Sequence, residues 1–317
     1  NVNDFLVEDA APTGGQPTEV EMTLVEVPGN VKLNLYTSIE NLIYDDLELK
    51  NFAGNFEVDN KTLAMKNVST ELLGGRVSLD GAYAYDEIKP MANFDLSYTN
   101  IRLADLLQKF NIIRAFAPLA EQVQALTTAK LSFASELNQD MSPKLANTNL
   151  GGVLNLQNVK IDKLASLQSI DKKLGTNHFN VQKLQDFLLK FEIKDGKLLV
   201  SPFDLFIDSS TLTLEGVSKL DGSLAYSGFL KIPGSYVKNE TTVLNNLTKG
   251  TSFSNLTLNP KDYLDIAINI GGTVKKPEVS LNLREIKTSI KQSVQNAVTQ
   301  EVDKRKEQIE QTAQNEL

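Results

Sequence analysis

The sequence contains no cysteine and no tryptophan, and its only histidine is His178. A chain without cysteine forms neither disulfides nor thiolate metal sites, so its redox compartment cannot be inferred from cysteine usage. His178, in TNHFNV, has no second histidine with which to share a metal, and we expect it on the surface or in a loop. No GxSxG elbow is present and no carboxylate pair stands out. The sequence therefore predicts no enzyme activity, no metal and no cofactor.

An excess of basic residues is also missing, because 32 lysines and arginines face 40 acids, for a net charge of −8. This balance argues against nucleic acid or an anionic membrane surface as the main partner. No apolar run approaches the ~20 residues that span a bilayer. The chain begins with Asn1 rather than Met. We expect a piece of a longer protein whose anchor lies elsewhere, with residues 1–29 as an N-terminal linker.

Alternating polarity is abundant, and it predicts strands with one polar and one apolar face. In 76–85, RVSLDGAYAY, Val77, Leu79 and Tyr83 point one way, whereas Arg76 and Ser78 point the other. Short turn signals such as KDG at 194–196 separate these runs, and short connections favour antiparallel pairing.

A 26-residue pattern occurs twice without a gap, as FEVDNKTLAMKNVSTELLGGRVSLDG at 56–81 and FEIKDGKLLVSPFDLFIDSSTLTLEG at 191–216. The two copies share five identities, among them Phe56 with Phe191 and Gly81 with Gly216. Polarity matches between the identities, so we interpret the pattern as an internal repeat. Each copy predicts three strands joined by two turns.

Helical spacing of apolar residues predicts a helix over 102–125, with Pro118 as a break or first-turn residue. Shorter helices are expected at 160–173, 181–190 and 235–249. The tail 284–317 has no glycine or proline and an apolar stripe four residues apart, which predicts one long helix. The stripe consists of Ile286, Ile290, Val294, Val298, Val302 and Ile309.

Together these features predict a mainly β protein with accessory helices (β+α). Its large curved antiparallel sheet is built from two repeats, folded over as a groove or a sandwich, and followed by a long C-terminal helix. The predicted divisions are the linker 1–29, a first repeat at 30–150 with helix 102–125, a second at 151–283, and a helical tail at 284–317.

Residues 42–81 and residues 191–232, which end in LDGSLAYSGFLKIP, resemble two copies of the repeating unit of AsmA-like proteins. Residues 270–281, IGGTVKKPEVSL, are similar to the terminal signature, with Gly272, Thr273 and Pro277 in its G-T-x-x-x-P places. The chain departs from the family at Asn60–Lys61 and Ser209–Ser210, and it has no N-terminal anchor.

The resemblance implies the C-terminal region of a periplasmic protein that is anchored to the inner membrane through a segment outside this chain. It also implies a non-enzymatic role in outer-membrane biogenesis, holding or conducting phospholipid or another acyl lipid along an apolar β-groove. The alternative is a closed β scaffold that acts through contacts with other envelope proteins. The residues expected to line the groove are Val58, Leu63, Met65, Val77, Leu79, Ile193, Leu198, Val200, Leu212 and Leu214.

Overall fold

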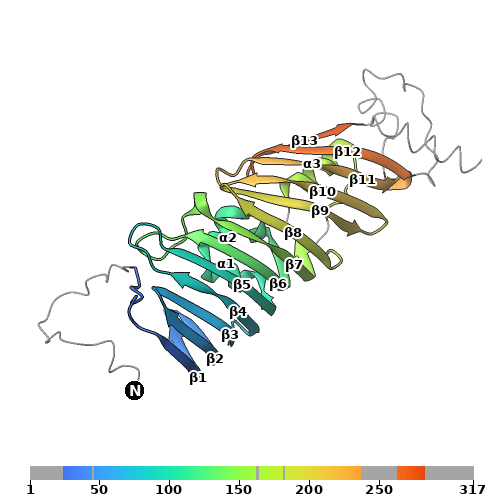
Figure 1. The fold of residues 1–317 in the computed structure, drawn as a ribbon. Coiled ribbons are helices and arrows are strands. Elements are labelled where there is room, and N and C mark those ends of the chain that lie inside the picture. The colour runs from blue at the N-terminus through green and yellow to red at the C-terminus, as the bar shows by residue number, and fades with distance from the viewer. Residues whose placement is uncertain (1–23, 45, 162–163, 181–182, 237–262, 283–317) are drawn as a thin grey trace, which may run out of the picture.

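The structure is a computed structural model, and it describes residues 24–44, 46–161, 164–180, 183–236 and 263–282. These residues form one 13-stranded antiparallel sheet in which the order of the strands is their order in the sequence (Figure 1). The strands are β1 (Leu33–Tyr44), β2 (Leu47–Asp59), β3 (Thr62–Leu72), β4 (Gly75–Ala84), β5 (Met91–Arg102), β6 (Val123–Glu136), β7 (Asn149–Ile161), β8 (Phe187–Lys194), β9 (Lys197–Ile207), β10 (Ser210–Lys219), β11 (Leu224–Pro233), β12 (Tyr263–Gly272) and β13 (Pro277–Asn282).

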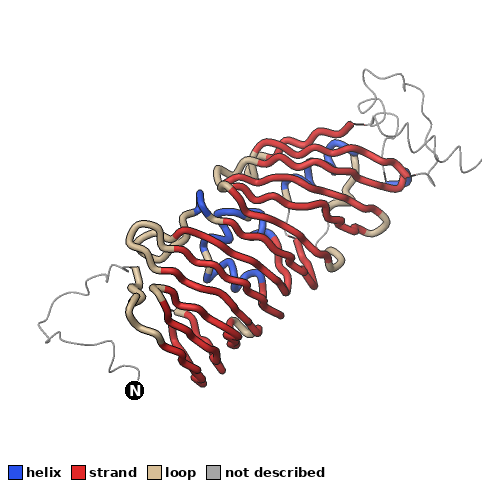
Figure 2. Tube along the Cα trace, in the orientation of Figure 1, coloured by secondary structure: helices blue, strands red, loops and turns tan. Residues whose placement is uncertain are grey.

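Three short α-helices lie on one side of this sheet (Figure 2). Helices α1 (Leu103–Lys109) and α2 (Asn111–Phe116), with the 3-10 turn η2 (Pro118–Gln122), connect β5 to β6. Helix α3 (Ala165–Leu174) lies in the connection between β7 and β8. Two further 3-10 turns are η3 (Leu145–Asn147) and η4 (Gly234–Tyr236).

The fold-class prediction is wrong in the form given above. The described residues form a single sheet with short helices, and the sheet does not fold over into a second layer. The physical reason lies in the connections. Two-residue turns join β2 to β3, β3 to β4, β8 to β9 and β9 to β10, so each strand is laid beside the one before it. The predicted C-terminal helix at 284–317 lies outside the described residues.

The predicted helices also need correction. The helix expected over 102–125 is interrupted at Phe110, which has extended φ and ψ (−120°, 90°), and again before Pro118, and strand β6 begins at Val123. The segment 160–173 begins as the end of β7, and its helix starts only at Ala165. Of the segment 181–190, the described residues 183–190 form no helix, and β8 begins at Phe187. Of the segment 235–249, only residues up to 236 are described, and they belong to η4.

The two copies of the repeat have the same strand register. Phe56 lies opposite Met65 as Phe191 lies opposite Val200. In both copies an extra residue enters the middle strand just after this pair, between 65 and 68 in the first copy and between 200 and 203 in the second. The boundary drawn at 150/151 falls within β7, which pairs with β6 and β8 on its two sides, so the sheet is continuous across it.

The first hairpin turn is also the same in both copies. Asn60 and Lys61 have φ of 47° and 60°, and Asp195 and Gly196 have φ of 50° and 67°. Two successive positive φ values characterise the type I′ turn, whose twist matches that of the strands it joins. Asn60–Lys61 therefore differs from an Asn-Gly turn in sequence but has the same backbone conformation as the turn at Asp195–Gly196.

The apolar face of the sheet

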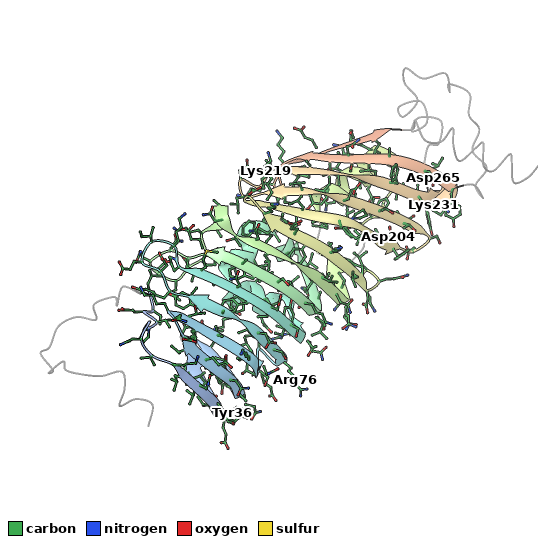
Figure 3. All side chains as sticks on the ribbon, in the orientation of Figure 1. Tyr36, Arg76, Asp204, Lys219, Lys231 and Asp265 are labelled. Atoms are coloured by element: carbon green, nitrogen blue, oxygen red, sulfur yellow. The ribbon has the colours of Figure 1, made fainter. Side chains whose placement is uncertain are left out.

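One face of the sheet carries an apolar row across most of its width. Residues directly opposite in an antiparallel pair share a face, so the row can be followed from strand to strand. Met65 lies opposite Gly81, and the row continues through Phe94, Phe133, Leu150 and Ile193 to Leu198. By the same register, all ten residues predicted to line a groove lie on this face, called here the apolar face. Charged side chains labelled in Figure 3 lie on the opposite face, namely Arg76, Asp204, Lys219, Lys231 and Asp265.

The C-terminal part of the apolar face is a buried core. Helix α3 packs Ile170 and Leu174, both 0% exposed, against strands β9 to β13. On those strands Leu212, Leu230 and Ile266 are also 0% exposed. Leu214 belongs to the same core. Most apolar side chains of these strands are buried on this face, and Phe203, Tyr226 and Leu281 are half-buried.

Helix α1 covers one margin of the apolar face over β4 to β6, and α2 lies over β8 and β9, in the row of the face that contains Ile193 and Leu198. Leu106 of α1 is in a buried cluster with Val77, Tyr98, Ile101 and Ala129 from strands β4 to β6. Farther along, Phe116 of α2 is 3% exposed and packs with Ile193, Leu198 and Val200 of β8 and β9. Residues Val77, Ile193, Leu198 and Val200 are therefore covered by protein.

The segment before β1 covers the opposite margin. Val27 is 4% exposed and packs with Tyr83, Ala92 and Leu137. The Tyr83 hydroxyl donates a hydrogen bond to the carbonyl oxygen of Val25 at 2.9 Å. This contact fixes the segment across the hairpin ends of β3, β4 and β5.

Between the two margins, strands β2 to β7 leave apolar side chains half-buried. Phe94 and Phe133 stack with their ring centroids 6.2 Å apart. Two positions on this part of the face are glycines: Gly81, between Met65 and Phe94, and Gly152, opposite Leu131. The half-buried residues, called here the apolar strip, are Phe56, Met65, Leu79, Phe94, Leu96, Leu131, Phe133 and Leu150.

The ten residues predicted as groove lining thus fall into two environments. Six are buried beneath the helices or in the C-terminal core: Val77, Ile193, Leu198, Val200, Leu212 and Leu214. Val58, Leu63, Met65 and Leu79 are half-buried, and the last two belong to the strip. Most of the strip was missed because the prediction used only the two repeat copies. The alternation of Phe94 with Leu96, and of Leu131 with Phe133, was the signal that could have found the rest.

Tyrosines on this face have perturbed acidity. Burial raises the pKa of Tyr98 and of Tyr226 above its ordinary value. Tyr226 is half-buried, and its hydroxyl lies 2.9 Å from that of Ser218, which is buried. Both rings are neutral at physiological pH and act as apolar packing with one polar atom.

His178 lies in a loop, one of the two places that the sequence predicted, but its side chain is not on the surface because it is 6% exposed. Its ring stacks on Tyr236 with centroids 4.3 Å apart, and its Nε2 lies 2.9 Å from Ser210 Oγ. Asp208 Oδ2 lies 3.9 Å from Nδ1. The order Ser, His, Asp resembles a hydrolytic triad, but Ser210 is 1% exposed and does not present its hydroxyl to solvent.

The loop that carries His178 is held by the carboxylate of Asp171, which is 6% exposed. Asp171 accepts hydrogen bonds from the Thr176 hydroxyl, from the His178 backbone N–H at 2.8 Å and from the Phe179 backbone N–H at 3.0 Å. These contacts identify a structural network that closes the end of α3. Within the ranges the structure describes, no group of three His, Cys, Asp or Glu residues could hold a metal ion.

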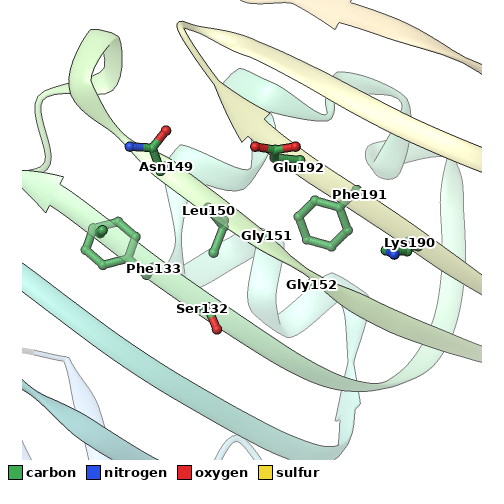
Figure 4. Close-up of a pocket in the computed structure, with 10 residues that line it drawn as sticks. Ser132, Phe133, Asn149, Leu150, Gly151, Gly152, Lys190, Phe191 and Glu192 are labelled. Atoms are coloured by element: carbon green, nitrogen blue, oxygen red, sulfur yellow. The ribbon is translucent and has the colours of Figure 1, made fainter.

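A hollow of about 390 Å³ lies where β6, β7 and β8 meet (Figure 4). Gly151 contributes to the gap because it has no side chain and a Cβ there would have only the Phe191 carbonyl oxygen within 4 Å, at 3.9 Å. Lys190 and Glu192 are its charged lining residues, and Phe133 and Phe191 are aromatic ones.

No described helix is long and apolar enough to cross a membrane. Comparisons of the chain with protein-family models, curated proteins and solved structures find no match.

Proposed function

We propose that this protein holds acyl lipid along the apolar strip of β2 to β7, without catalysing a reaction. The observation that supports the proposal is the contrast between the two parts of the same face. Over β9 to β13 most of the face is buried beneath α3, whereas a row of phenylalanine, leucine and methionine on β2 to β7 stays half-buried between α1 and the 24–28 segment.

The chemistry of the strip fits an acyl chain rather than a polar ligand. The strip has two rows of opposed residues, one from Met65 to Leu150 and one from Leu79 to Gly152. Both rows contain only apolar side chains and glycine, so no side chain in them would form a hydrogen bond or an ion pair with a ligand. Transfer of an acyl chain from water onto such a surface contributes about 0.8 kcal/mol per buried CH₂. A charged headgroup would remain in water beyond the margins of the strip. Phospholipid is the ligand class we propose first.

The same proposal includes the setting that the AsmA-like resemblance implies. We infer a periplasmic protein that is part of a longer chain anchored in the inner membrane and that takes part in outer-membrane biogenesis. The support is the resemblance of the three segments 42–81, 191–232 and 270–281, together with a face suited to lipid. A scaffold that acts through protein contacts is the second candidate, and the sealed core over β9 to β13 favours it.

The test compares adjacent residues on β4 that face opposite ways. Leu79→Asp places a carboxylate in the strip, and Ser78→Asp places one on the exposed opposite face. Purified proteins are analysed by native mass spectrometry and lipid extraction, and are titrated with cis-parinaric acid, a fluorescent fatty acid. We expect the parent and Ser78→Asp to bind equally, and Leu79→Asp to stay folded and lose most of the bound lipid.

Leu214→Asp is the control for a sealed site. It buries an unpaired charge in the core, so we expect this variant to unfold. A parent that binds neither extracted lipid nor the fatty-acid probe would contradict the proposal. A folded Leu79→Asp variant that binds as much of both as the parent would contradict it too, and either result would favour the scaffold.

A further inference from the structure

The first strand of the sheet, β1, is an edge strand without the features that prevent pairing with a further strand. β1 pairs with β2 along one side, and no strand among the described residues pairs with its other side. Tyr36, Ile43 and Tyr44 are 68%, 71% and 66% exposed, and Leu33 and Leu35 are about half exposed (Figure 3 labels Tyr36). Exposed apolar side chains are therefore concentrated on an edge strand, one side of whose backbone has no strand partner among the described residues.

The opposite edge of the sheet is built differently. β13 has six residues, begins at Pro277 and follows Lys275 and Lys276. Short length, proline and lysine are the features by which proteins prevent an edge strand from accepting another strand. β1 has twelve residues, no proline and a single charged residue, Glu40. Only the β1 edge is suited to accept a partner strand.

We propose that the partner is a second copy of this chain, with the two β1 strands paired antiparallel across a two-fold axis perpendicular to the sheet. An overlap of eleven residues, 34–44, places Leu35 opposite Ile43 and Glu40 opposite Ser38, so that opposite residues share a face and like charges do not meet. A head-to-tail contact with β13 would match only six residues and would leave one β1 edge open. The two-fold contact closes both edges at once.

The contact also extends the apolar face. Leu33 lies opposite Val58 and Leu35 opposite Phe56, so both leucines belong to the apolar face at its uncovered end. Antiparallel pairing keeps equivalent faces on the same side of a sheet. The apolar faces of two copies would therefore join, and the exposed leucines would gain neighbours. This inference does not depend on the proposed lipid function.

The experiment measures the mass of the whole chain by light scattering coupled to size exclusion, from about 1 to about 100 μM. We expect the parent to approach twice its 35.0 kDa as concentration rises. Tyr36→Lys with Ile43→Lys places four lysines in the contact and is expected to raise the dimer dissociation constant at least about tenfold. The matched control carries Ile88→Lys and Phe229→Lys, at two exposed apolar residues away from β1, and should dimerise as the parent does.

A cross-linking measurement keeps the test decisive if the lysine variant does not fold. Because the chain has no cysteine, Ser38→Cys with Glu40→Cys introduces the only thiols, at two positions that lie opposite each other across the contact, and oxidation should give a disulfide-linked dimer. Ile88→Cys should not cross-link efficiently. A parent that remains monomeric, a dimer that survives the two lysines in folded protein, or the absence of a cross-link would each overturn the proposal. A monomeric parent would leave the edge to a strand of another protein.

Discussion

Two successive glycines in β7 should respond in opposite ways to alanine. A Cβ atom at Gly152 would lie 2.4 Å from the carbonyl oxygen of Lys130 and 2.6 Å from Leu131 Cδ2. A Cβ at Gly151 would have its nearest neighbour, the carbonyl oxygen of Phe191, at 3.9 Å. Both glycines lie in the same strand, one on each face of the sheet.

The magnitudes follow from what can move. The carbonyl at Lys130 belongs to β6, which is paired on both sides, so it cannot retreat without distorting two ladders. We expect Gly152→Ala to lower the free energy of unfolding by about 1–3 kcal/mol, as overpacking does elsewhere. Gly151→Ala meets ordinary space at a negative φ and restricts the unfolded chain, so it should be neutral or raise stability by up to about 1 kcal/mol.

Urea denaturation followed by circular dichroism measures both variants against the parent. A difference of about 2 kcal/mol between the two variants, with Gly152→Ala the less stable, is the expected result. Equal stabilities would mean that β6 and β7 are not packed as described. A more stable Gly152→Ala would refute the steric argument altogether.

Three further predictions concern buried polar groups. Thr127→Val removes the hydroxyl that donates to the carbonyl oxygen of Ile101 at 2.7 Å, and should cost about 1–3 kcal/mol in the same denaturation assay, whereas Thr128→Val on the other face should cost less. Asp171→Asn replaces the carboxylate that accepts three hydrogen bonds, and should also cost about 1–3 kcal/mol; unchanged stability would show that the loop after α3 is held by other contacts. Burial raises the pKa of Tyr98 and Tyr226 in the folded protein above that of unfolded tyrosine, which titrates at about pH 10. Their ionisation should therefore leave the free energy of unfolding unchanged below about pH 10, and should lower it as the pH rises through the pKa values of the folded state. Unfolding measured between pH 8 and 11 checks the sign, and Tyr98→Phe should make the alkaline decline shallower.

The sequence predicted which residues share a face of the sheet better than it predicted where helices and strands begin and end. Alternation in 76–85 identifies Val77 and Leu79 as sharing a side, and the register bears this geometry out. The repeat carried further information, because Gly81 and Gly216 each leave room for an aromatic residue of the next strand, Phe94 and Tyr226. A Cβ at either glycine would lie within 3 Å of that neighbour. Such positions tolerate little variation, which explains why the pattern is visible in both copies.

The helices were harder to predict because the local spacing of apolar residues does not show whether a segment will pair with neighbouring strands instead of forming a helix. FLLKFEIK at 187–194 has successive leucines, and the sequence pattern there fits a helix as well as a strand. In the sheet Leu189 lies on the apolar face, whereas Leu188 is 57% exposed on the other. One apolar residue on the solvent side was enough to disguise the period of two.

Whether an apolar face is open or sealed depends on the connections rather than on the strands. Val77 and Leu79 are two residues apart in one strand and have the same pattern, yet Val77 is buried beneath α1 and Leu79 is half-buried beside it. The difference comes from the excursion at 103–122, which Phe110 and Pro118 divide into short pieces. Helix α1 packs on Val77 and Ile101, and Phe116 of α2 packs on Ile193 and Val200, so neither piece lies over Leu79. The places where these short pieces pack therefore decide which apolar residues of the face are buried and which stay half-buried.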